Sequence, residues 1–291
     1  MSFLSDVFGG IVRKTDKENW QERIEAIKKI ASQSRTGRQV IDEAYEKHPN
    51  LKIRMRDDMP GALGCYNLAG RTISLNAKCS DEALAATLVH EARHACQNDR
   101  ASDRASLKSM VMANRVCEAD AMAFECAAAC EIGGAVRDSF NEKHGGIVSA
   151  YETAMEKTWN KDAALAEAFK AWFDNHPYVS RYDRQMFQFA RQAGYAKPGR
   201  KLSPEQIIKS VLPERKNGGT YLGGGSAFLN EPRFCSLTKK ALLTGRFAAF
   251  VCMDKSVRDF YVEQKDGTAA PQQPLTLNRG VSWLAGGRKE R

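Results

Sequence analysis

The alternation of apolar and polar residues predicts two short β-strands in the first third of the chain. In LKIRMRD, residues 51 to 57, Leu51, Ile53 and Met55 alternate with basic residues. A period of two is that of a strand with one buried face. RTISLNA, residues 71 to 77, repeats the pattern, with an isoleucine and a leucine on one face and polar residues on the other. We expect this second strand to be half-buried and to lie at an edge of its sheet.

Longer stretches carry apolar residues at helical spacing, separated by turn and cap residues. Ser80 is placed to cap one helix, and the acids that follow it suit the positive end of the helix dipole. Gly133 and Gly134 are placed to end another helix. The expected helical segments are residues 17 to 47 with a break at SQSRTGR, 81 to 97, 103 to 131, and 148 to 194 with a break at NHPY.

Composition and charge describe an ordinary globular chain. Of its 291 residues, 43% are hydrophobic and 27% are charged, and the net charge is +9. Basic residues are interleaved with acids, as in RIEAIKK, which favours a mildly basic surface over a dedicated nucleic-acid groove. The charge still leaves nucleic acid open as a partner.

The N-terminus has no secretory-signal pattern, and no apolar run is long enough to span a membrane. The chain has eight cysteines and no C-x-x-C pair, which indicates a reducing compartment. We therefore expect a cytoplasmic protein without a membrane partner, although export by a dedicated secretion system is compatible with the sequence. Cys126 and Cys130, one helical turn apart, could share a metal only with two further ligands nearby.

The segment TLVHEARHAC, residues 87 to 96, carries the candidate chemistry. His90 and His94 are four residues apart, so a helix projects both imidazoles from one face, where they can bind one Zn²⁺. Glu91 follows the first histidine, at the position of the general base in H-E-x-x-H sites. Since Leu84, Leu88 and two alanines give this helix a buried face, a surface helix that carries two histidines by chance is the weaker interpretation.

GCYNLAGRTISLNAKCSDEALAATLVHEARHACQ, residues 64 to 97, resembles the strand-then-helix unit of the zincin metallopeptidases. SRTGRQVIDEAYEKHPNLKIR, residues 34 to 54, resembles the lead-in of small, poorly characterised metallopeptidase domains, some of them secreted effectors. The resemblance covers about residues 35 to 135. It implies an α+β fold, mostly helical, with a small antiparallel sheet and a C-terminal extension. It also implies that the strand just before the helix pairs with the substrate backbone.

This resemblance, together with a change of texture at about residue 198, gives the expected domain organisation. From that point prolines, NGG and GGG interrupt short apolar runs. We expect an N-terminal helical segment at residues 1 to 35, a zincin-like domain at 36 to 197 with its core at 36 to 135, and a C-terminal lobe or tail at 198 to 291.

Three protein ligands and one open position are usual in catalytic zinc sites. The metzincin extension is excluded, because Gln97 and Arg100 stand where it requires glycine and histidine. The resemblance to gluzincins implies a glutamate on the following helix, and Glu118 is the first choice. Asp120 and Glu125 are alternative ligands, or acids that orient a ligating histidine.

The sequence therefore predicts a gluzincin-type peptidase with one Zn²⁺ per chain, Glu91 as general base, and a protein or peptide substrate. His176, Tyr178 and Tyr182 are candidate stabilisers of the oxyanion, although helix punctuation followed by a new helix is the stronger interpretation of their segment. Two alternatives stay open. One is a non-catalytic protein on the same scaffold that uses its basic surface on nucleic acid or a protein partner. The other is a hydrolase of non-peptide amides.

Overall fold

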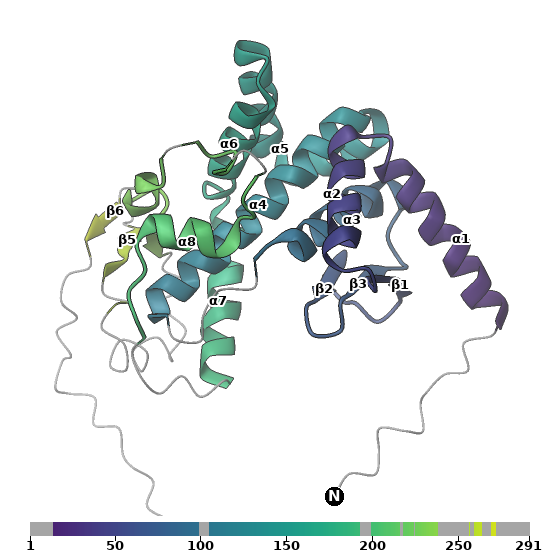
Figure 1. Cartoon of the computed structure of the whole chain (residues 1–291), viewed down its shortest axis with the longest axis horizontal. Coiled ribbons are helices and arrows are strands. Elements are labelled where there is room, and N and C mark those ends of the chain that lie inside the picture. The colour runs from purple at the N-terminus through teal and green to yellow at the C-terminus, as the bar shows by residue number, and fades with distance from the viewer. Residues whose placement is uncertain are drawn as a thin grey trace, which may run out of the picture.

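Two helices, α3 (Asp81–Cys96) and α4 (Leu107–Ile132), lie at the centre of the computed structural model of the chain (Figure 1). The structure describes residues 14–98, 105–192, 199–215, 218–223, 225–237, 256, 259–263 and 269–271. The two central helices pack against each other over much of their length, and the other helices pack around them. The predicted α+β class is confirmed, with helices dominating the chain.

The elements before α3 follow the predicted order, with one further strand between the two that were predicted. The first two helices are separated at Ser32–Ser34, and Ser34 caps the second by accepting a hydrogen bond from the Gly37 amide. A small sheet then precedes α3. The bounds are α1 (Lys14–Ala31), α2 (Arg35–Lys47), β1 (Lys52–Arg56), β2 (Gly64–Asn67) and β3 (Thr72–Asn76).

The sheet differs from the prediction in its pairing. Its strand order is β1-β3-β2, with β1 parallel and β2 antiparallel to β3, so the sheet is mixed and not antiparallel. The strand before α3 is therefore central and not at an edge, and its residues from Ile73 to Asn76 are buried on both faces. Alternation identifies a strand but not its neighbours, and the unpredicted strand β2 occupies the edge where β3 was expected.

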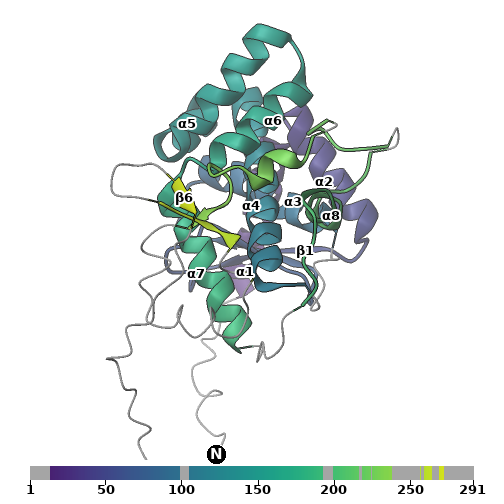
Figure 2. The ribbon, with the colours of Figure 1, turned by 90° about the vertical axis from the view of Figure 1, so that its left-hand side faces the viewer.

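Helix α4 is followed by α5 (Gly134–Thr158), α6 (Lys161–Trp172) and α7 (His176–Gln192). Figure 2 shows α5 and α6 on one side of α4 and α7 on the other. Helix α5 begins well before the predicted residue 148 and contains a break, because His144 has non-helical backbone angles (φ −135°, ψ 30°). Gly145 and Gly146 follow, and two glycines in a helix interior weaken it by roughly 2 kcal/mol relative to alanines.

The described residues beyond 198 pack on the same core as the rest of the chain. Helix α8 (Pro204–Val211), which starts with a capping box at Ser203, lies against α4. Tyr221, Phe234 and Leu237 are buried with it in the common core. A short 3₁₀ helix (Ala227–Asn230) and the small strands β4 (Ser236–Leu237), β5 (Tyr261–Glu263) and β6 (Ala269–Pro271) complete this part.

A buried ion pair ties α4 to α7 and to the segment after α8. The Arg115 guanidinium donates to both carboxylate oxygens of Asp183, at 2.9 and 2.7 Å. It also donates to the backbone carbonyls of Phe234 and Ser236. Both charged side chains are 1% exposed. The pairing satisfies two buried charges that would otherwise be strongly destabilising.

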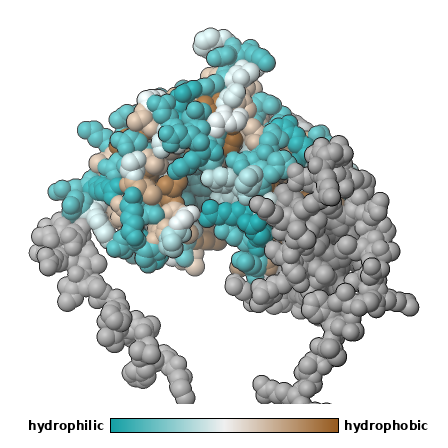
Figure 3. All heavy atoms as spheres, turned by 180° about the vertical axis from the view of Figure 1, so that it is seen from behind, coloured by the Kyte–Doolittle hydropathy of each residue, from teal (hydrophilic) through white to brown (hydrophobic). Residues whose placement is uncertain are grey.

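On the face shown in Figure 3, the coloured side chains are largely hydrophilic, with small apolar patches between them. Among the described residues, no helix has the length and apolar character that crossing a bilayer requires.

Candidate metal centre

Helix α3 brings His90 and His94 together on one face. Ser80 caps the helix by accepting a hydrogen bond from the Ala83 amide, as predicted. The spacing of four residues then places the two rings one turn apart, and their Nε2 atoms are 3.1 Å from each other. The helix is buried on nearly every side, with Leu84 and Leu88 at 0% exposure, and this packing fixes the direction in which the histidines point.

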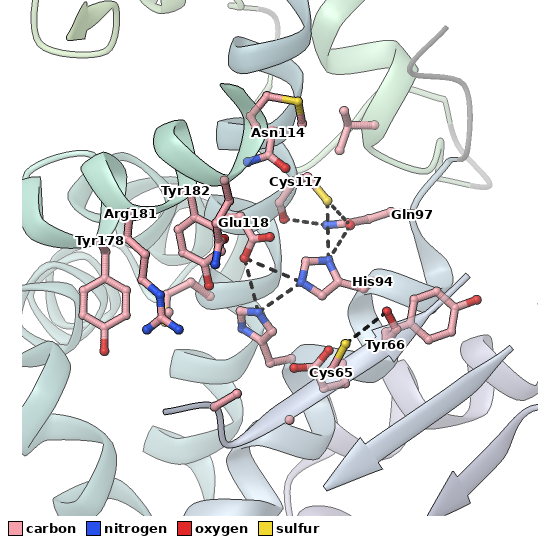
Figure 4. A pocket seen from close by; sticks show the side chains of 18 of the residues that line it. Cys65, Tyr66, His94, Gln97, Asn114, Cys117, Glu118, Tyr178, Arg181 and Tyr182 are labelled. Carbon is pink, nitrogen blue, oxygen red and sulfur yellow. Dashed lines mark hydrogen bonds and ion pairs between the residues drawn. The ribbon is translucent and has the colours of Figure 1, made fainter. Parts of the chain in front are cut away.

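Glu118 of α4 faces His94 of α3 in Figure 4, and it lies close to His90 as well. Its Oε2 lies 3.6 Å from Nε2 of His90 and 3.7 Å from Nε2 of His94. One donor atom from each of the three residues lies within 4.8 Å of the others. Two imidazoles and a carboxylate converging in this way match the ligand set of a catalytic zinc site.

The surroundings favour positive charge at this point. Burial disfavours the charged form of His90, but Glu125 and Glu118 outweigh it and raise the pKa of His90 to about 10. Burial likewise opposes the charge on His94, and Cys117 and Glu118 raise the pKa of His94 well above its usual value. The pKa of Glu118 is lowered against the effect of its own burial, because His94 and His90 stabilise the carboxylate. A cation fits this donor set.

Gln97, just after α3, holds the outer nitrogen of His94. Its Oε1 lies 2.8 Å from His94 Nδ1, and the Cys117 thiol donates to the same oxygen at 2.7 Å. The amide nitrogen of Gln97 donates to the Cys117 carbonyl and to Asp120 Oδ2, each at 2.8 Å. Because two acceptors occupy its NH₂ group, the oxygen of Gln97 must be the atom that faces His94.

Asp120 lies outside the group of three ligand candidates and touches neither histidine in any described contact. It receives two hydrogen bonds from Arg93, at 2.8 and 3.0 Å, and one from the Tyr221 hydroxyl at 3.0 Å. It is fully buried, and so is the Arg93 side chain, which stacks on Phe124 at 3.9 Å. Asp120 therefore positions Gln97, and through it His94, rather than orienting a histidine directly.

Glu125 also lies outside the ligand group, on the far side of His90. Its Oε2 is 2.9 Å from Nδ1 of His90, the nitrogen turned away from Glu118. The contact is close but poorly aligned, because this Nδ1 has no properly directed hydrogen bond. The arrangement leaves Nε2 of His90 free to face His94 and Glu118.

Glu91 is buried beside the three candidate ligands, at 7% exposure. Burial raises the pKa of its carboxyl group, and the two histidines oppose that effect. Strand β2 comes very close to it: a Cβ placed on Gly64 would lie 2.7 Å from Thr87 Cγ2 and 2.9 Å from Glu91 Cγ. Only glycine allows the edge strand to approach α3 in this way.

The three ligand candidates and Glu91 open into one cavity of about 1250 Å³. Strand β2 forms one wall through Gly64, Cys65 and Tyr66. The opposite wall comes from α4 and α7. Apolar side chains reach the mouth, and Leu68 and Phe189 are 50% and 57% exposed there.

Of the three residues on α7 named as candidate oxyanion stabilisers, the structure brings two into the cavity. Tyr178 and Tyr182 line it, whereas His176 is exposed at the start of the helix and does not. Burial, the charge of Glu118 and a hydrogen bond with its carboxylate raise the pKa of Tyr182 far above its usual value. Arg181, between the tyrosines, donates to the Gly61 carbonyl at 3.2 Å across the cavity (Figure 4).

Sequence reasoning missed His144, which lines the same cavity at the break in α5. A signal was present: HGG interrupts a stretch that otherwise has helical spacing. Gln97 and Gly64 were also missed, because their importance depends on what packs against them.

Among the described residues, Cys126 and Cys130 gain no further ligands, and they interact with each other on α4.

The fold and the site together define a class of protein: a mainly helical domain with a candidate His-His-Glu metal site that opens into a cavity. Residues 11–198 match the family described as "Putative metallopeptidase family (DUF6782)". The match covers well over half of the chain, and the chain belongs to this family. No curated protein and no solved structure matches the chain.

Proposed function

We propose that this protein is a zinc-dependent peptidase of the gluzincin type, with one zinc ion per chain. The observation that carries the proposal is the convergence of His90, His94 and Glu118, with the buried Glu91 beside them in one cavity. A zinc site that only stabilised the fold would have four protein ligands and no open position, and it would not need a carboxylate such as Glu91 beside the ligands. When bound, a zinc ion supplies a Lewis acid that acidifies water and polarises a carbonyl group.

In this proposal Glu91 moves the proton. Burial raises the pKa of its carboxyl group, and a carboxylate with a raised pKa is a stronger proton acceptor. Glu91 accepts a proton from the attacking water and delivers it to the leaving amine of the peptide bond. The backbone of β2 at Gly64 packs closely against the Glu91 side chain and so limits the positions that the carboxylate can take.

The substrate would lie along strand β2. The strand before α3 was expected to pair with it, but β3 already has a partner on each side. Strand β2 has a free edge in the described sheet and lines the cavity, so it is the strand that can pair with an extended peptide. The exposed Leu68 and Phe189 at the mouth favour a peptide with apolar side chains near the cleaved bond.

Tyr182 is the candidate donor for the carbonyl oxygen under attack. Its hydroxyl interacts with Glu118, which places it beside the candidate ligands, and its high pKa keeps the proton available for donation.

The cysteines support a reducing compartment such as the cytoplasm, because all seven in the described chain are free and one of them, Cys117, contacts His94.

The test is hydrolysis of a mixed peptide library by the zinc-loaded protein, with cleavage sites read by mass spectrometry. Wild type should cleave the library, and Glu91→Gln should retain zinc but lose at least about 10³-fold in rate. Glu82→Gln, at the start of the same helix and away from the histidines, is the matched control. Equal cleavage by Glu91→Gln and wild type would contradict the proposal.

A further inference from the structure

We propose that His144 is a catalytic residue that donates a hydrogen bond from Nε2 to a carbonyl oxygen of the peptide bound in the cavity. The proposal rests on the proposed peptidase function and adds a second wall to its substrate site. Strand β2 would pair with one side of the peptide backbone. His144, at the break in α5, would donate a hydrogen bond to the peptide from another side of the cavity.

Position and backbone single His144 out. It lines the cavity together with His90 and Glu125, yet it comes from α5, at the residue whose non-helical angles interrupt the interior of that helix. The glycines that follow leave open space on one side: a Cβ on Gly146 would meet nothing within 4 Å. Close packing therefore does not explain the second glycine, whereas a local break that turns the histidine into the cavity does.

The packing around the side chain at position 144 does not explain why this residue is a histidine. The imidazole is 7% exposed and is held between Phe140 and Tyr178, with ring centroids 4.8 and 5.0 Å away. Its Nδ1 is buried without a hydrogen-bond partner. An apolar side chain would fill this place without an unsatisfied polar atom, so a histidine here has a cost to stability that packing does not offset.

The buried nitrogen also fixes the tautomer. A buried N–H group without an acceptor is rarer and less tolerable than an unused lone pair. We therefore assign the lone pair to Nδ1 and the proton to Nε2, on the edge of the ring that remains for the cavity. Burial lowers the pKa of His144, and His90 and Lys143 add to that effect while Glu125 opposes it. The ring is thus a neutral donor, suited to a carbonyl oxygen.

The first measurement is the tautomer, by ¹⁵N NMR of the histidine rings in the metal-free full-length chain at neutral pH. The His144 signal is assigned by its loss in His144→Phe, a variant that keeps an aromatic ring between Phe140 and Tyr178. We expect the proton on Nε2. A proton on Nδ1 would overturn the proposal, whatever the fate of the peptidase function.

The second measurement is calorimetry on the zinc-loaded chain with two probes. Acetohydroxamate binds a zinc ion without a peptide, and an alanine-flanked phosphinic peptide adds a backbone with carbonyl oxygens. His144→Phe should weaken the phosphinic peptide about tenfold, the effect of one lost hydrogen bond, and leave acetohydroxamate unchanged. His176→Phe, which replaces an exposed histidine outside the cavity, should change neither.

Unchanged binding of the phosphinic peptide by His144→Phe would overturn the proposal. Binding of acetohydroxamate but not of the peptide by wild type would overturn it as well, since His144 would then have no carbonyl ligand to hold. Failure of wild type to bind zinc or acetohydroxamate would instead remove the peptidase function, so the two failures are distinguishable.

Discussion

The side-chain oxygen of Gln97 lies 2.8 Å from Nδ1 of His94, and this contact determines which nitrogen of the histidine can bind a metal. The amide of Gln97 cannot turn around, because its NH₂ group is engaged by the Cys117 carbonyl and by Asp120. An acceptor at Nδ1 requires the proton to be there. Nε2 of His94 is then left with its lone pair toward His90 and Glu118.

Loss of Gln97 should therefore weaken zinc binding. We expect Gln97→Leu to lower zinc affinity about 10- to 100-fold, the usual effect of removing the group that orients a histidine ligand. Competition with a chelator of known affinity measures this. Gln185→Leu changes an exposed glutamine that also lines the cavity and should leave the affinity unchanged. Equal affinities of Gln97→Leu and wild type would show that the contact does not orient His94.

Gly64 should be required for the position of Glu91 and not for the metal. A methyl group there would lie 2.7 Å from Thr87 and 2.9 Å from Glu91, so Gly64→Ala must displace a side chain or the edge strand. We expect zinc content close to that of wild type and cleavage of the peptide library at least about 10-fold slower. Gly225→Ala, whose added methyl meets nothing within 4 Å, is the control. Wild-type rates in Gly64→Ala would refute the positioning role.

The buried pair of Arg115 and Asp183 should dominate the stability of the contact between α4, α7 and the segment near Phe234. Arg115→Met leaves a buried carboxylate unpaired, at a cost of about 3–5 kcal/mol in the free energy of unfolding. Urea denaturation measures it. Arg137→Met breaks a solvent-exposed pair with Glu152 and should cost much less than Arg115→Met. Similar costs for both variants would mean that the Arg115 pair is not desolvated as the structure shows.

Glu131 should make stability depend on pH in the acid range. Burial raises the pKa of its carboxyl group, but hydrogen bonds from Thr36 and Ser34 at the start of α2 outweigh it and hold the pKa below its ordinary 4.5. The ionised form stabilises the fold above that value, and its contribution is lost as the pH falls through the lowered pKa.

Glu131→Gln should therefore be less stable than wild type by about 1–3 kcal/mol at neutral pH. The difference in the free energy of unfolding should shrink as the solution is acidified. Glu156→Gln, at an exposed position on α5, should stay within about 0.5 kcal/mol of wild type. A difference between wild type and Glu131→Gln that does not change with pH would mean that the charge of Glu131 is not what stabilises the cap.

Local patterns predicted the parts of this structure that local physics controls. Ser80, the acids after it and the apolar face of α3 identified the helix and the pairing of His90 with His94, because a helix relates residues four apart by geometry alone. Gly133 ended α4 as expected, at φ 74°. The resemblance to a family indicated a glutamate ligand on the following helix. Glu118 was the first choice there because it lies 24 residues after His94, far enough for the chain to turn back past the first helix.

The remaining features depend on contacts between distant segments. Alternation could not show that β2 would take the edge beside β3, since pairing partners are chosen by the whole sheet. His144 was missed because the sequence does not show which way the break at HGG turns its side chain, and the structure places it in the cavity. Asp120 looked like a partner of a histidine, but Arg93 and Tyr221 hold it against Gln97 instead.

Metal content, measured by mass spectrometry on the purified and zinc-reconstituted chain, tests the central claim most directly. Wild type should hold one zinc ion per chain, and folded Glu118→Gln should lose it. Glu125→Gln, two turns further along α4, should still fill with zinc, although with lower affinity. Wild type that holds no zinc, or a Glu118→Gln variant that holds as much as wild type, would contradict a metal centre built from His90, His94 and Glu118.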